Sequence, residues 1–82
     1  MDEKTFNDLL RNVDQMIQTS APEVAEYLRG YRLGIIFHQS GIEEDPEEHF
    51  YLRGPHAGNS DRYLGAFARG YCDGCNGALL DD

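Results

Sequence analysis

The sequence predicts an all-α fold: a small helical bundle of three long helices plus one short helix, in a single helical domain spanning residues 1–82. Apolar residues recur at the three- and four-residue spacing of amphipathic helices, and no stretch shows the apolar–polar alternation of a strand. A further observation is a pseudo-repeat of about 40 residues, in which the pattern Arg-Gly-Tyr-x-x-Gly occurs twice. Because 82 residues bury only a small core, the helices are expected to pack closely.

The repeated pattern lies at residues 29–34 and again at 69–74, and each copy contains two glycines four residues apart. A glycine inside a helix costs about 1 kcal/mol relative to alanine. Such a pair therefore indicates a compensating gain, namely a flat strip that lets a second helix approach closely. The predicted helix-packing residues are Gly30, Gly34, Gly70 and Gly74. Two arrangements remain open: the strips pack on each other within one chain, or one strip forms the twofold interface of a homodimer.

The first helix is predicted to begin near Asp2 or Thr5 and to end around Thr19. Its apolar residues form one stripe at helical spacing: Phe6, Leu9, Leu10, Val13, Met16 and Ile17. Charged and amide side chains occupy the other face. We therefore expect this helix to contact the core along one side.

The second helix is predicted to start with Ser20 as its N-cap, because proline is tolerated at Pro22 in the first turn and Glu23 can reach back to the cap. Its predicted buried side consists of Val24, Tyr27, Leu28, Tyr31, Ile35 and Phe37. The helix is expected to finish near Gln39, with residues 40–41 as the break.

The short helix is predicted to follow Asp45 as N-cap, with Pro46 at its first position and acids in its first turn. It should run for about two turns and stop at residues 54–55, which read Gly-Pro. The last helix is predicted to begin at Asn59 or Ser60 and to fray from Asn76 onward. Its apolar stripe is Leu64, Phe67, Ala68, Tyr71, Cys75 and Leu79, and beside it lies a ladder of small residues, Ala66, Gly70, Gly74 and Ala78.

The charge balance restricts the possible partners. Fifteen Asp and Glu against seven Lys and Arg give a net charge of −8, which repels nucleic acid and anionic membranes. The same charge attracts basic surfaces, including those that bind nucleic acid. The densest acidic stretch is followed by two aromatic residues, so the predicted partner-binding residues are Glu43, Glu44, Asp45, Glu47, Glu48, Phe50 and Tyr51. Acids of the first helix are candidates to join them: Asp2, Glu3, Asp8 and Asp14.

In size, acidity and lack of a catalytic motif, the chain resembles small phage or mobile-element inhibitors, including anti-CRISPR proteins and other DNA mimics. The resemblance is one of overall character and transfers no functional residue. It implies a non-catalytic inhibitor whose carboxylates replace phosphates on a basic nucleic-acid-binding protein and block access of DNA. We expect no enzymatic activity and no cofactor. We also expect a cytoplasmic location (the host cytoplasm if the chain is phage-encoded), since no signal peptide or long apolar run is present.

Cys72 and Cys75 form a C-x-x-C motif. A structural zinc site needs four ligands, and no second such motif accompanies the three histidines of the chain. A thioredoxin-type pair would open a helix after a strand, whereas this pair lies inside a predicted helix. We therefore predict no metal site, with Cys75 in the core and no role for Cys72. The alternative functions are a helical homodimeric adaptor and a small zinc-binding module.

Overall fold

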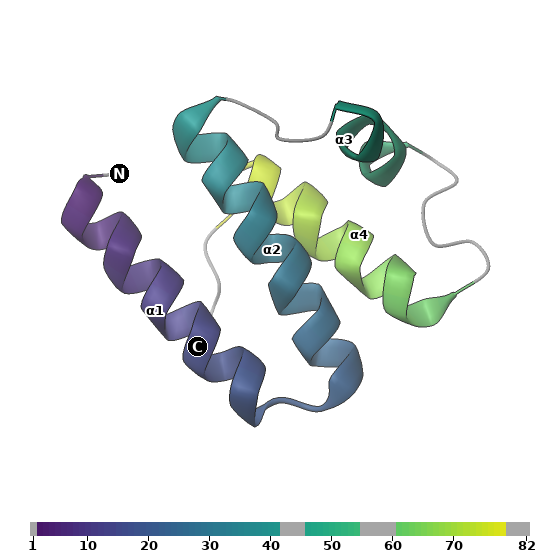
Figure 1. Cartoon of the computed structure of the whole chain (residues 1–82), viewed down its shortest axis with the longest axis horizontal. Helices are drawn as coiled ribbons and strands as arrows, with labels where there is room; N and C mark the ends of the chain where they lie inside the picture. The colour runs from purple at the N-terminus through teal and green to yellow at the C-terminus, as the bar shows by residue number, and fades with distance from the viewer. Residues whose placement is uncertain (1, 42–45, 55–60, 79–82) are drawn as a thin grey trace.

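The computed structural model describes residues 2–41, 46–54 and 61–78. Within these ranges the chain forms four helices and no strand, which confirms the all-α prediction (Figure 1). The helices are α1 (Glu3–Thr19), α2 (Pro22–Ser40), α3 (Pro46–Arg53) and α4 (Arg62–Cys75). Helices α2 and α4 form the central pair, with α1 against α2 and α3 against α4. Figure 1 shows α1 and α3 on opposite sides of that pair.

Helices α2 and α4 touch backbone to backbone where their glycines meet. A Cβ atom on Gly30 would lie 2.8 Å from the carbonyl carbon of Phe67 in α4, and closer still to its oxygen. A Cβ atom on Gly70 would lie 2.8 Å from the carbonyl carbon of Tyr27 in α2, again with the oxygen closer. No side chain fits in that space. Of the two predicted arrangements, the structure therefore has the one in which the glycine strips pack on each other within one chain.

The glycine contacts are reciprocal at an offset of 40 residues. A Cβ atom on Gly34 would lie 2.8 Å from the backbone nitrogen of Cys75, and one on Gly74 would lie 2.6 Å from that of Ile35. Adding 40 to the numbers of one helix gives the numbers of the other, so the crossing has local pseudo-twofold symmetry. That the two halves as wholes are repeats stays a prediction, because α1 has 17 residues and α3 has only 8.

Two small apolar clusters flank the crossing, and their stripes on α2 and α4 obey the same offset. In the first cluster, Val13 of α1 packs against a stripe of α2 made of Leu28, Tyr31 and Ile35. In the second, Leu52 of α3 packs against a stripe of α4 made of Ala68, Tyr71 and Cys75. Among the described residues, each outer helix thus contributes one fully buried aliphatic side chain to its cluster, and α1 adds several partly buried ones. The core is divided in two because the glycine crossing leaves no space for side chains between α2 and α4.

The helix ends differ from the prediction at two caps. Ser20 does not cap α2: its hydroxyl donates to the carbonyl oxygen of Met16 (2.6 Å), and Ala21 occupies the N-cap position without a side-chain hydrogen bond. The N-cap of α4 is Asp61, whose carboxylate accepts from the backbone N–H of Tyr63 at 2.8 Å. The predicted caps at residues 59–60 lie outside the described residues. Aspartate is the stronger choice because its charge also complements the helix dipole.

The other ends agree with the sequence. Asp2 caps α1 by accepting from the backbone N–H of Thr5 at 2.7 Å. Helix α2 ends at Gly41, whose φ of 73° is the left-handed conformation that glycine adopts without strain. Helix α3 begins at Pro46, as predicted.

Two residues of the predicted apolar stripes, Met16 of α1 and Val24 of α2, are in fact at the surface. Val24 is 50% exposed, whereas its neighbour Ala25 is buried. Val24 lies in the first turn of α2, one turn before Leu28 and on the same face of the helix. The first apolar cluster covers that face from Leu28 onward and does not include Val24. The periodicity predicted the buried face of α2 correctly, but not the length over which other helices cover that face.

Candidate protein-interaction surface

Helix α3 carries the described part of the predicted partner-binding stretch. Glu47 and Glu48 lie in its first turn, where carboxylates complement the positive end of the helix dipole, and Arg53 lies in its last turn. Both glutamates are exposed. Three predicted partner-binding residues, Glu43, Glu44 and Asp45, lie outside the described residues, as does the side chain of Phe50. The local sequence explains why a helix forms here, since proline and acids at its start both favour helix initiation.

Three interactions fix α3 on the central pair through its inner face. Leu52 is 2% exposed and packs in the second apolar cluster. Its carbonyl oxygen accepts a hydrogen bond from the thiol of Cys72 at 3.5 Å. The ring of His49 lies 4.6 Å from the ring of Phe37 in α2, and its Nδ1 shares a hydrogen bond with the hydroxyl of Tyr71 in α4. The inner face is thus specified, and the helix can present only the opposite face to a partner.

The outer face of α3 combines negative charge with an aromatic side chain. Tyr51 is 47% exposed, which is a large exposed fraction for a tyrosine side chain. It follows Glu47 by four residues and Glu48 by three, so the three side chains share one side of the helix. An exposed tyrosine beside acids is the composition expected of an interface anchor with a charged rim. The structure therefore brings together three of the seven predicted partner-binding residues.

The acids of α1 belong to a different region of the molecule. Asp14 accepts from the guanidinium Nε of Arg32 at 2.8 Å, and Asp8 lies 3.8 Å from the guanidinium of Arg11. Helices α1 and α3 lie on opposite sides of the central pair (Figure 1). These acids therefore do not extend the surface of α3, which corrects the expectation that they would join it.

The charge is also unequally divided along the chain. Residues 42–82 contain nine acids and three bases, a net charge of −6, whereas residues 1–41 contain six acids and four bases, a net charge of −2. The half of the sequence that includes α3 therefore dominates the attraction to a basic partner. The ion pairs of α1 and α2 reduce the remaining field further, since neutralised pairs contribute little at a distance.

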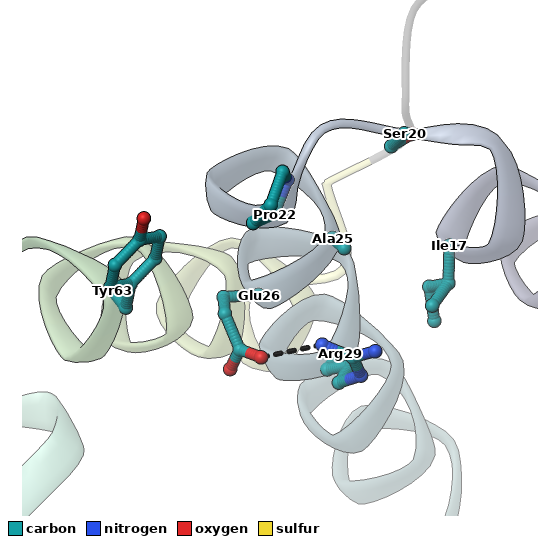
Figure 2. A pocket seen from close by; sticks show the side chains of 7 residues that line it. All are labelled: Ile17, Ser20, Pro22, Ala25, Glu26, Arg29 and Tyr63. Carbon is teal, nitrogen blue, oxygen red and sulfur yellow. Dashed lines mark hydrogen bonds and ion pairs between the residues drawn. The ribbon is translucent and has the colours of Figure 1, made fainter.

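A separate hollow of about 570 Å³ lies where the end of α1, the start of α2 and the start of α4 meet. Figure 2 shows its lining: Ile17, Ser20, Pro22, Ala25, Glu26, Arg29 and Tyr63. Its two charged side chains form an ion pair with each other, Glu26 with Arg29, as the sequence predicts for neighbours at this spacing. The hollow therefore offers no net charge to a ligand. The sequence did not predict this hollow, because its lining comes from three helices, α1, α2 and α4, whose residues come together only in the folded chain.

In the part of the chain that the structure describes, both cysteines of the C-x-x-C motif contact protein groups. No cluster of three or more His, Cys, Asp or Glu side chains there is arranged to hold a metal ion. Cys75 is 7% exposed in the second apolar cluster, as predicted, and burial raises the pKa of its thiol. Cys72 was predicted to have no role, but its thiol contacts the carbonyl oxygen of Leu52. That prediction was wrong because it did not anticipate where α3 docks.

Two tyrosine hydroxyls tie the central pair together beside the glycine crossing. Tyr27 of α2 donates to the carboxylate of Asp73 in α4, and Tyr31 donates to the carbonyl oxygen of Ala78 at 2.7 Å. Burial and the neighbouring Asp73 carboxylate raise the pKa of Tyr27 to about 12, and burial raises the pKa of Tyr31 as well. Both hydroxyls are therefore held in the protonated form that makes these bonds.

We expect the fold to lose stability in alkali between pH 10 and about 12. A phenol whose pKa is raised on folding stabilises the native state fully below its unfolded pKa of 10.0, and this contribution disappears as pH rises through the folded value. For the partly solvated Tyr27 we expect roughly 1–2 kcal/mol after allowance for solvent screening. Denaturant unfolding at a series of pH values measures it. Tyr27→Phe should flatten the decline, and an equally steep decline in that variant would contradict the assignment.

Comparison of the chain with protein-family models, with curated proteins and with solved structures gave no match. Among the helices that the structure describes, none combines the length and the apolar content needed to cross a membrane.

Proposed function

We propose that this chain is a non-catalytic binding protein that uses residues 42–48 and the outer face of α3 to occupy a basic surface of another protein. The observation that supports this best is the docking of α3 through Leu52 and His49 on its inner face. That docking leaves Glu47, Glu48 and Tyr51 directed outward, next to the most acidic stretch of the sequence.

The proposed partner is a nucleic-acid-binding protein, and the proposed effect is inhibition by exclusion of DNA, as in anti-CRISPR proteins and other DNA mimics. Carboxylates would take the places of phosphates against lysines and arginines. Charges at the rim would mainly raise the association rate, because they steer the encounter of the two proteins. Tyr51 would supply the buried anchor that holds the complex together, since aromatic side chains dominate the binding energy of interfaces.

A charge reversal on α3 tests this proposal. The double variant Glu47→Lys and Glu48→Lys should weaken binding at least about tenfold, because it places like charges against the basic surface. A matched control is Glu3→Lys with Glu23→Lys, which changes net charge equally and also alters acids in the first turns of helices, α1 and α2.

The measurement uses the tagged full-length chain to capture partners from an extract at low salt, followed by titration with the purified partner. Duplex DNA should compete with the chain for that partner, and high salt should weaken the complex. If both double variants lost binding equally, the loss would be due to the change in net charge, and α3 would be excluded as the binding site. A partner that binds the chain and DNA at the same time would exclude the DNA-mimic mechanism.

A further inference from the structure

Both cysteines of α4 lie beside the docked α3. The thiol of Cys72 donates to the backbone carbonyl of Leu52, and the buried Cys75 belongs to the apolar cluster that receives the Leu52 side chain. Both are free thiols in the structure.

The two cysteines lie one turn apart, and α4 ends at Cys75. Side chains at this spacing have Cβ atoms about 5–6 Å apart, whereas a disulfide requires about 3.5–4.5 Å. Closing that gap distorts the last turn of α4. This turn also touches α2, since a Cβ atom on Gly34 would lie 2.8 Å from the backbone nitrogen of Cys75.

We propose that Cys72 and Cys75 form a thiol switch, in which oxidation to an intrahelical disulfide releases α3 from α4. The disulfide turns the Cys72 sulfur away from the Leu52 carbonyl, removes its hydrogen-bonding proton and shifts Cys75 within the cluster. The release of α3 goes beyond the proposed function and does not depend on it. Only its consequence, the loss of an ordered acidic surface for the partner, rests on the proposed function.

A low-molecular-weight disulfide of the glutathione class is the oxidant, and the step balances as thiol–disulfide exchange. Cys72, which is the more exposed of the two, loses its proton and attacks one sulfur of the oxidant, so that a mixed disulfide forms and one thiol leaves. Cys75 then loses its proton and attacks the Cys72 sulfur, which releases the second small thiol. Two protein thiols are oxidised to one disulfide, and one small disulfide is reduced to two thiols.

Hydrogen exchange of the full-length chain before and after treatment with excess glutathione disulfide tests the switch. Oxidation should remove two hydrogen atoms from the intact mass and speed amide exchange in residues 47–53 by roughly tenfold, which corresponds to the loss of a weak hydrogen bond and part of an apolar contact. Exchange near Gly30, which contacts α4 at Phe67 and not in the turn that holds the cysteines, should stay unchanged. Reduction should restore the original pattern.

Two variants make the result specific. The double variant Cys72→Ser and Cys75→Ser should show no response to glutathione disulfide in mass or in exchange. The single variant Cys72→Ser should keep the slow exchange of α3, because a serine hydroxyl can donate to the same carbonyl oxygen. The proposal is overturned if no internal disulfide forms, if it forms without faster exchange in residues 47–53, or if exchange rises equally throughout the chain. No partner is present in this assay, so its failure and that of the proposed function are distinguishable.

Discussion

Replacing Gly70 with alanine is expected to remove at least about 3 kcal/mol from the free energy of unfolding. The added methyl group would lie 2.8 Å from the carbonyl carbon of Tyr27 and 2.9 Å from the backbone nitrogen of Tyr31, both of which belong to the opposite helix. Backbone atoms cannot rotate away as a side chain does, so α2 and α4 would have to separate. A domain of this size is stable by roughly 4–12 kcal/mol, so the loss amounts to at least about a quarter of the total.

The direction of the effect is diagnostic. In a helix that touches nothing, alanine is more favourable than glycine by about 1 kcal/mol, so the same substitution would stabilise the protein if the crossing were absent. Denaturant unfolding followed by circular dichroism measures the change. Gly30→Ala should cost about as much as Gly70→Ala, because the two glycines make reciprocal contacts.

Gly41→Ala is the matched control for that experiment. Gly41 has a φ of 73° but no atom within 4 Å of the position of a Cβ, so alanine there meets backbone strain without a clash. We expect it to cost about 1–2 kcal/mol. If Gly70→Ala costs no more than Gly41→Ala, the two helices do not approach as closely as the structure has them.

The glycine crossing could be predicted from the sequence because its cause is local and steric. Gly30 and Gly34 interrupt a helix at a cost that only close packing repays, and Gly70 and Gly74 do so again. The sequence could not decide between packing within one chain and packing between two. Both arrangements place one glycine strip against another, so the spacing of the glycines is equally compatible with either.

The wrong predictions concern residues whose environment is set by another helix. Ser20 has a hydroxyl suitable for capping α2, but the end of α1 offers it a carbonyl oxygen instead. Val24 lies on the correct face but beyond the covered part of the helix. The contact of Cys72 depends on where α3 docks, which follows from His49 and Leu52 rather than from the C-x-x-C spacing.

The candidate surface was partly predictable for the same reason. The acidic stretch and the start of α3 are both formed by consecutive residues. Glu47, Glu48 and Tyr51 could therefore be predicted as part of one surface from their neighbouring positions in the sequence. The sequence could not predict that the acids of α1 lie outside this surface, because composition does not reveal that α1 and α3 lie on opposite sides of the central pair. Ion pairs such as that of Asp14 with Arg32 join different helices and become visible only in the folded chain.

Replacing Tyr31 with alanine should have the second large effect, a loss of about 3–5 kcal/mol. Tyr31 is 0% exposed and packs in the first apolar cluster against Val13, so truncation leaves a cavity under α1. It also leaves the carbonyl oxygen of Ala78 without its hydrogen-bond donor. Because Tyr31 links α1, α2 and the end of α4, we expect α1 to lose protection from hydrogen exchange before α3 does.

Tyr31→Phe separates the ring from the hydroxyl. It retains the buried ring and removes only the hydrogen bond to Ala78, so it should cost about 1 kcal/mol. Denaturant unfolding of both variants gives the two contributions, since the difference between them is the cost of the cavity. If Tyr31→Phe destabilised the protein as much as Tyr31→Ala, the hydrogen bond to Ala78 rather than the packed ring would account for the contribution of Tyr31. The two-cluster description of the core would then be wrong, because its first cluster requires the ring of Tyr31 to pack against Val13.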